Sequence, residues 1–450
     1  MKVASFFYAL ALLTLPVGPA TKLLLGREEM VWLDPTLIFG VLAFAALIPA
    51  WRAEHSRQLP QVAPILSGLA LICIACALSG YLLRLPENLY GALREPLKFF
   101  LMIIWFVTSC WFLRFRSSLV FRWASVAAVL GILSGLSIYF MAAGLLPVSA
   151  GAVSYSRLYI LRQSIWFDFT PIPRMGGLFI EAPPFGLTML ALWVLFCVAL
   201  RSGVRTKATL IGAGFSLIGA LASLSDQVTV GLAICATASV LSITTRPRWM
   251  KRAVLSFTVV VFIGVCVLSL QSKLTAAADA QTAVNIYRNS VGERTFHLNY
   301  GLSVLRREPS AALFGIGPGR YGEYVAETGL FPAETTMQYT GPELLVEWGV
   351  AGVAVWLLAI VLLSDQVWKL HAMGGLGMLI GLLISDSFQA NWKLEAVFLA
   401  IAALCTSQLA SSKNGKAAVS KAFSPPPLPP AGKGKKPLPS GWTAGEVPST

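Results

Sequence analysis

The chain has 450 residues, of which 56% are hydrophobic and only 12% are charged, and its mean hydropathy is +0.70. These values exclude a soluble domain of this length, and the repeated apolar runs of about 18 or more residues indicate membrane-spanning helices. The formal net charge of +14 does not indicate a nucleic-acid partner, because the positive charges are spread over short connections and a terminal tail.

We predict an all-α, polytopic integral membrane protein with about twelve transmembrane helices in a domain of residues 1–410. The apolar runs are continuous rather than alternating, which is typical of helices. The first run ends near Gly18-Pro19-Ala20, which loosely resembles a signal-peptide cleavage site, but the spans that follow favour a retained helix. The seventh and eighth spans are short and could form a re-entrant or broken pair. The predicted spans are 3–24, 35–51, 61–83, 97–113, 123–143, 178–200, 208–224, 227–244, 253–270, 343–363, 372–388 and 394–410.

The distribution of lysine and arginine predicts the orientation of these spans. Among the short loops, the positive charges gather on the side that holds the N-terminus, and the positive-inside rule makes that side cytoplasmic. Both termini are then cytoplasmic, and two long loops, about 145–175 and 271–342, face outward. Residues 411–450 are rich in proline and lysine and are predicted to form a disordered cytoplasmic tail.

Cysteine and histidine usage predicts neither disulfides nor a metal site. All seven cysteines lie in apolar runs, and we interpret the C-x-x-C of Cys73 and Cys76 as small packing residues. The three histidines, His55, His297 and His371, are far apart in the sequence and are predicted on different faces of the membrane. We therefore expect no metal.

The first outer loop carries an acid–base candidate where it enters the sixth span. The segment R-M-G-G-L-F-I-E-A-P-P-F-G runs from Arg174 to Gly186. Glu181 lies near the outer end of the span, where a carboxylate needs a partner or water, and Arg174 is the nearest basic residue in sequence. An interface anchor, with a snorkelling arginine and a capping glutamate, is the alternative, but the clustering with glycines and prolines favours a functional site. Asp226, between the seventh and eighth spans, is expected to line a polar cavity or reach the outer surface.

The second outer loop is rich in arginine. Residues 281–308 are predicted to form a helix, because apolar and aromatic side chains recur at helical spacing, and Pro309 ends it. Arg288, Arg294 and Arg320 are candidate ligands of a diphosphate, since guanidinium groups bind phosphate oxygens in pairs. For any one of these arginines, a solvated charged helix is an equally good interpretation. His297 is a candidate proton acceptor, although a lone histidine is more often structural.

The same loop contains G-I-G-P-G-R-Y, from Gly315 to Tyr321, which predicts a tight turn. Backbone N–H groups at Gly315, Gly317 and Gly319 could form an anion-binding nest. No Lys-Ser/Thr follows, so the turn is not a Walker motif, and we predict no nucleotide cofactor.

These segments resemble the O-antigen ligase/polymerase superfamily of bacterial envelope enzymes. G-L-F-I-E-A-P-P-F-G is similar to a polymerase pattern in which arginine and G-L-F precede E-P-S. The stretch from Arg294 through R-E-P-S-A-A-L-F-G-I-G-P-G-R-Y resembles that superfamily's aromatic helix, proline and G-x-G-P-G turn. E-L-L-V-E-W-G-V-A-G-V, from Glu343 to Val353, resembles the glutamate-x-glycine start of its next span. Ligases of the superfamily carry His-Asn shortly before that glycine, where this chain has Gln338-Tyr339, so the resemblance favours a Wzy-type polysaccharide polymerase.

The resemblance implies a membrane glycosyltransferase that acts on a polyprenyl-diphosphate-linked glycan at the outer face of a bacterial inner membrane. Arg174, Arg294 and, as further candidates, Arg288 and Arg320 would bind the diphosphate, and Glu181 or His297 would accept the proton. No cofactor is needed in such a scheme. The implied partners are the lipid-linked glycan, membrane lipid and, as a further candidate, a chain-length regulator protein.

Two other classes of function are alternatives for this sequence. A secondary transporter or flippase also fits twelve spans with both ends inside, but a major-facilitator arrangement would place the long loop centrally and in the cytoplasm. A scaffolding or lipid-binding membrane protein would not need acidic and basic groups clustered at the outer ends of spans.

We expect single cysteines introduced between 280 and 330 to react with a membrane-impermeant maleimide added to intact spheroplasts, because this loop is predicted to face outward. Labelling that occurs only after the membrane is permeabilised would place the loop in the cytosol and contradict the predicted orientation.

Overall fold

The structure is a computed structural model that describes residues 1–16, 34–53, 62–83, 89–167, 170–179, 182–241, 290–329, 340–387 and 395–406. The chain divides into two compact units, Met1–Ala410 and Ser411–Thr450. The second unit, which includes the predicted tail, lies outside the described residues. The predicted ninth span, 253–270, also lies outside them.

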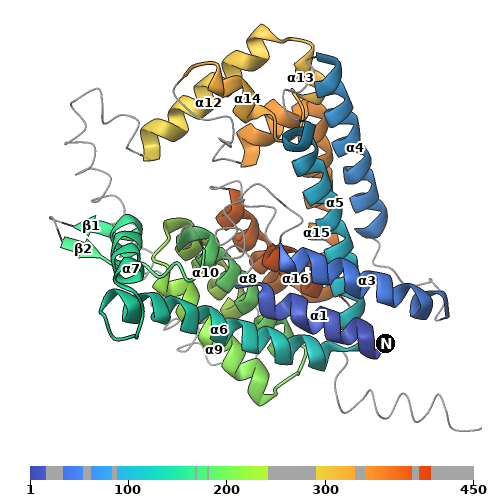
Figure 1. Cartoon of the computed structure of the whole chain (residues 1–450). Coiled ribbons are helices and arrows are strands. Elements are labelled where there is room, and N and C mark those ends of the chain that lie inside the picture. The colour runs from blue at the N-terminus through green and yellow to red at the C-terminus, as the bar shows by residue number, and fades with distance from the viewer. Residues whose placement is uncertain are drawn as a thin grey trace, which may run out of the picture. The chain divides into compact units, whose positions relative to one another are not determined.

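The described part of the first unit is helical apart from one short hairpin (Figure 1). Its apolar helices are α1 (Lys2–Thr14), α3 (Pro35–Ala53), α4 (Val62–Leu83), α5 (Leu89–Phe115), α6 (Ser117–Ala142), α8 (Ala182–Arg201), α9 (Lys207–Ala222), α10 (Asp226–Leu241), α15 (Thr340–Ser387) and α16 (Glu395–Cys405). The connections contribute α7 (Ala150–Gln163), an antiparallel hairpin of β1 (Ile165–Phe167) and β2 (Thr170–Ile172), α12 (Ser290–Arg307), α13 (Ala311–Phe314) and α14 (Tyr321–Ala326).

Four of the described helices are long and apolar enough to cross a membrane: Pro96–Phe115 within α5, all of α6, all of α8, and Gly341–Asp386 within α15. The predicted helical fold is therefore confirmed for the described residues, whereas the count of about twelve spans stays a prediction. Helix α15 covers the predicted tenth and eleventh spans, and non-helical backbone at Ala372 separates them.

An aromatic cluster joins the N-terminal helix to α5. The Tyr8 ring stacks on Trp105 and Phe112 at centroid distances of 5.2 and 4.0 Å, and its hydroxyl donates to Ser109 Oγ at 3.0 Å. The Trp105 indole N–H donates to the Glu395 carbonyl oxygen at 2.8 Å, which connects α5 to α16. A buried hydroxyl and a buried indole N–H thus each have a partner, as an apolar interior requires.

Helices α10 and α15 approach closely because glycines face one another. A Cβ added at Gly381 would lie 2.6 Å from the Gly231 carbonyl oxygen and 2.5 Å from Cys235 Sγ. A Cβ added at Gly377 would lie 2.0 Å from the Ala238 Cβ. Small residues at a helix–helix contact let two backbones meet, and inside a membrane this packing replaces the hydrophobic driving force.

We predict that Gly381→Val weakens the α10–α15 contact by about 1–3 kcal/mol, because the added methyl groups overpack a site with no space. Thermal unfolding of the purified protein in detergent should show a lower midpoint. Gly214→Val in α9 is the matched control, because nothing lies within 4 Å of a Cβ added there. Equal midpoints for the two variants would contradict the close approach.

Candidate functional site

The G-I-G-P-G-R-Y turn lies against the start of α15 and against α4. Gly315, Gly317 and Gly319 have φ angles of 77°, 103° and 75°, a region that favours glycine, so the predicted tight turn is confirmed. A Cβ added at Gly315 would lie 2.2 Å from the Glu347 carbonyl carbon. Ile316 N–H donates to the Val346 carbonyl oxygen and Gly317 N–H to that of Glu347, each at 3.0 Å. The turn is thus hydrogen-bonded along α15 where Gly349, at φ 66°, interrupts that helix.

The carboxylate of Glu347 fills the concave side of this turn. Its Oε2 accepts the Gly319 N–H at 2.8 Å, and its Oε1 accepts the Tyr321 N–H at 3.2 Å. The Glu347 side chain is only 3% exposed. Of the three predicted nest glycines, only Gly319 donates its N–H to a carboxylate, and that carboxylate belongs to the same chain, whereas the N–H groups of Gly315 and Gly317 donate to carbonyl oxygens. The predicted nest is not open to a substrate anion in this structure.

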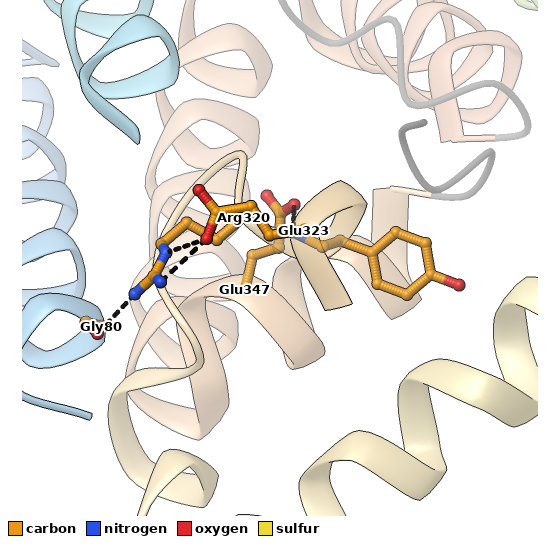
Figure 2. A network of polar contacts seen from close by, with 5 residues as sticks. Gly80, Arg320, Glu323 and Glu347 are labelled. Carbon is orange, nitrogen blue, oxygen red and sulfur yellow. Dashed lines mark hydrogen bonds and ion pairs between the residues drawn. The ribbon is translucent and has the colours of Figure 1, made fainter. Parts of the chain in front are cut away.

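Arg320 is also held by protein groups (Figure 2). Its side chain is 1% exposed, and its Nε and Nη2 donate to Glu323 Oε2 at 3.1 and 2.9 Å. Its Nη1 donates to the Gly80 carbonyl oxygen of α4 at 2.5 Å. A guanidinium that is buried in this way joins the turn to α4, and the geometry gives no support to its predicted role as a diphosphate ligand.

His297 joins α12 to α14. Its ring Nδ1 lies 2.9 Å from the Tyr321 hydroxyl, which donates to the His297 carbonyl oxygen at 3.3 Å. His297 is 1% exposed, so the hydroxyl group of a substrate in solvent does not reach its ring in this structure. Burial raises the pKa of Tyr321, and burial also raises that of Tyr300, whose hydroxyl donates to the Tyr324 carbonyl oxygen. Both phenols therefore stay protonated at neutral pH and act as hydrogen-bond donors.

These contacts form a continuous connection from a spanning helix to the arginine-bearing helix. Glu347 of α15 holds Tyr321 through its backbone N–H, and Tyr321 holds His297 of α12 through its hydroxyl. Arg294 lies one turn before His297 in α12, and the structure describes its place in the helix but not its side chain. Arg288 and Glu181 lie outside the described residues.

Arg174 contacts a different set of helices. Its Nε donates to the Ser223 carbonyl oxygen at 3.0 Å, and Met175 N–H donates to that of Ala222 at 2.9 Å. The half-buried Arg174 is thus placed against the end of α9, just before Asp226 begins α10. A Cβ at Gly176 would lie 2.4 Å from the Tyr159 hydroxyl oxygen of α7, so the Gly176 backbone passes close to that side chain.

The partners that organise the turn come from segments distant in the sequence, and no local pattern pairs them. Glu347 lies in the E-L-L-V-E-W-G motif, but the sequence alone assigns it no role. It assigns none to Glu323 or Gly80 either. The glutamate two residues before Gly349 in that motif is the signal that could have identified Glu347. Nothing in the sequence indicates Gly80, because its contribution to the contact is a backbone carbonyl.

Within the described ranges, no group of three or more His, Cys, Asp or Glu side chains could hold a metal ion. The sequence matches no protein-family model, and a search of curated proteins finds no match.

We predict that Glu347→Ala loosens the turn, because it leaves the buried N–H groups of Gly319 and Tyr321 without their acceptor, at about 1–3 kcal/mol for each. Hydrogen exchange of a peptide that covers 315–321 should accelerate about tenfold or more.

Glu327→Ala is the control for this experiment, because Glu327 is an exposed carboxylate just after α14. Unchanged exchange in the Glu347 variant would show that the carboxylate does not hold the turn.

Proposed function

We propose that this protein is a multi-pass membrane glycosyltransferase that polymerises polyprenyl-diphosphate-linked oligosaccharide repeats into O-antigen or exopolysaccharide. The observation that carries the proposal is that two motifs of the resemblance interlock. The glycine turn that begins at Gly315 packs on Glu347 and Gly349, although each segment was recognised separately in the sequence. Motifs that belong to one functional unit should meet in this way, and unrelated matches would have no reason to do so.

The proposed setting is the outer face of the bacterial inner membrane, with about twelve spans and both termini in the cytoplasm. The apolar helices of the described part support a membrane location. Helix α12 and the turn are the parts of the second outer loop that would meet a lipid-linked substrate. Their contacts with α4 and α15 would hold them at the end of spanning helices.

The proposed reaction is a displacement at the anomeric carbon of the donor sugar. The acceptor hydroxyl oxygen forms the new glycosidic bond, the bond from the anomeric carbon to the phosphate oxygen breaks, and polyprenyl diphosphate leaves. Negative charge builds on the leaving group, so fixed cations are the main electrostatic requirement. Arg174, Arg294 and Arg288 are the proposed cations, and this scheme needs no nucleotide or metal.

The roles of the remaining candidates follow from their burial. Glu181 is the leading proposed base, because the buried His297 is engaged with Tyr321. His297 and Arg320 are proposed to position α12 and the turn rather than to contact the substrate. The proposal thus assigns structural support to His297 and Arg320, and substrate contact to Arg174, Arg294 and Arg288.

We predict that Arg174→Ala and Arg294→Ala each abolish polymer formation, since each removes a cation that would offset charge on the departing diphosphate. Surface glycans of a deletion strain that carries each variant should contain single repeats only. Membrane extracts should contain the variant protein at its normal level. Arg205→Ala is the control, because Arg205 is exposed in the connection between α8 and α9. Polymer of normal length in the Arg174 and Arg294 variants would refute their assignment.

Deletion of the gene distinguishes the classes of function. Single-repeat caps on the acceptor would support the polymerase. Bare acceptor with accumulated lipid-linked polymer would instead identify a ligase that transfers finished glycan. Unchanged surface glycan would reject both enzymes and favour a transporter or flippase.

A further inference from the structure

Helix α7 has one face that is occupied by protein and another that is apolar and exposed. On the inner face, Ser156 is buried, and the Tyr159 hydroxyl donates to the carbonyl oxygens of Gly177 and Phe179. On the outer face, Tyr155 is 58% exposed and Leu158 is 66% exposed, and Leu161 follows at helical spacing. The helix therefore turns large apolar side chains away from the rest of the protein.

The connection that precedes α7 extends the apolar surface. Leu145 is 70% exposed, and Val148 is exposed beside the start of the helix. Exposed apolar side chains that are contiguous mark a site of contact with a membrane or with another protein. The last turns of α12, which also lies outside the predicted spans, instead expose Asn299, Arg306 and Arg307. The exposed face of α7 thus differs from the exposed end of α12.

The position of α7 in the chain places this face at the boundary of a spanning helix. Helix α6 is long and apolar enough to cross a membrane, and it ends at Ala142, just before the 143–149 connection (Figure 1). Arg157 Nε donates to the Ala142 carbonyl oxygen at 2.8 Å, so α7 is fastened to the last turn of that span. Helix α7 therefore lies beside the end of α6.

The charge of the segment specifies the lipid. Residues 143–163 contain Arg157 and Arg162 and no aspartate or glutamate. A helix with apolar side chains and arginines binds in the interface of a bilayer, and anionic headgroups strengthen that binding. Contact with the same face of a second copy would bring like charges together, which disfavours a dimer through α7.

We propose that α7 is a membrane-surface helix, with Tyr155, Leu158 and Leu161 inserted among lipid chains and the exposed Arg157 at anionic headgroups. This inference does not depend on the proposed enzymatic activity. It has a consequence for the Arg174 segment, since Tyr159 connects α7 to the Gly177–Phe179 turn. The lipid contact would keep that segment at the depth of the headgroups, where a diphosphate attached to a lipid also lies.

The test is the immersion depth of a nitroxide attached to Leu158→Cys in the full chain, reconstituted in phosphatidylethanolamine–phosphatidylglycerol nanodiscs. Collision with oxygen, which concentrates in lipid, is compared with collision with a water-soluble nickel chelate. Leu133→Cys, exposed on α6, serves as the lipid control, and Ser310→Cys, exposed between α12 and α13, serves as the water control. The unmodified chain, labelled in parallel, measures the background from native cysteines, and those in the described part are buried or half-buried.

We expect the Leu158 label to collide with oxygen more than with the nickel chelate, as the Leu133 label does and the Ser310 label does not. Replacing phosphatidylglycerol by phosphatidylcholine should move the label toward water. Collision with nickel equal to that at Ser310 would overturn the proposal. Protection from both reagents, with spin–spin broadening between chains, would assign the face to a second copy instead. An immersed label that does not respond to the change of lipid would overturn the anionic-headgroup part.

Discussion

The buried carboxylate of Glu347 is the constraint on which this part of the molecule depends. A carboxylate that is removed from water must be paired or hydrogen-bonded, and here the N–H groups of Gly319 and Tyr321 supply those bonds. The turn can bring its backbone so close only because Gly315 has no side chain where it meets Glu347. Arg320 extends the same arrangement to α4, so one network fixes a connecting segment to two apolar helices.

This network separates the charged residues by function. Arg320 pairs with Glu323 at 2.9 Å, and Glu347 accepts hydrogen bonds from backbone N–H groups, so all three are engaged with protein groups in this structure. Arg307 lies with its guanidinium 5.8 Å from the Tyr300 ring centroid, at the exposed end of α12. In the proposal, the arginines that bind the substrate are Arg288 and Arg294 of the second outer loop and Arg174 of the first. In the proposal, rigid support and substrate contact thus fall to different side chains.

Local sequence signals predicted the local structure well. The helix predicted over 281–308 is present as Ser290–Arg307, residues 281–289 lie outside the described residues, and its end before Pro309 agrees with the lack of a proline N–H. The turn required positive φ angles, and its glycines supplied them. Hydropathy identified apolar helices and placed a connection between the tenth and eleventh spans just before Ala372, where the backbone of α15 is non-helical, but it gave no sign of the break at Gly349 within the tenth span. Such a break depends on one residue's backbone, which a hydropathy average does not detect.

The sequence by itself determined the helical class, the membrane-compatible composition and the position of the glycine turn, because each follows from composition or from neighbouring residues along the chain. The tertiary structure alone decided which groups those elements meet. Arg320 was predicted as a phosphate ligand, yet its partner at Gly80 lies 240 residues away in sequence. The anion in the nest and the buried setting of His297 are likewise set by contacts between segments. A guanidinium group carries the same charge whether it binds a substrate phosphate or a carbonyl oxygen of the protein. Only the tertiary structure shows which acceptor lies within hydrogen-bond distance.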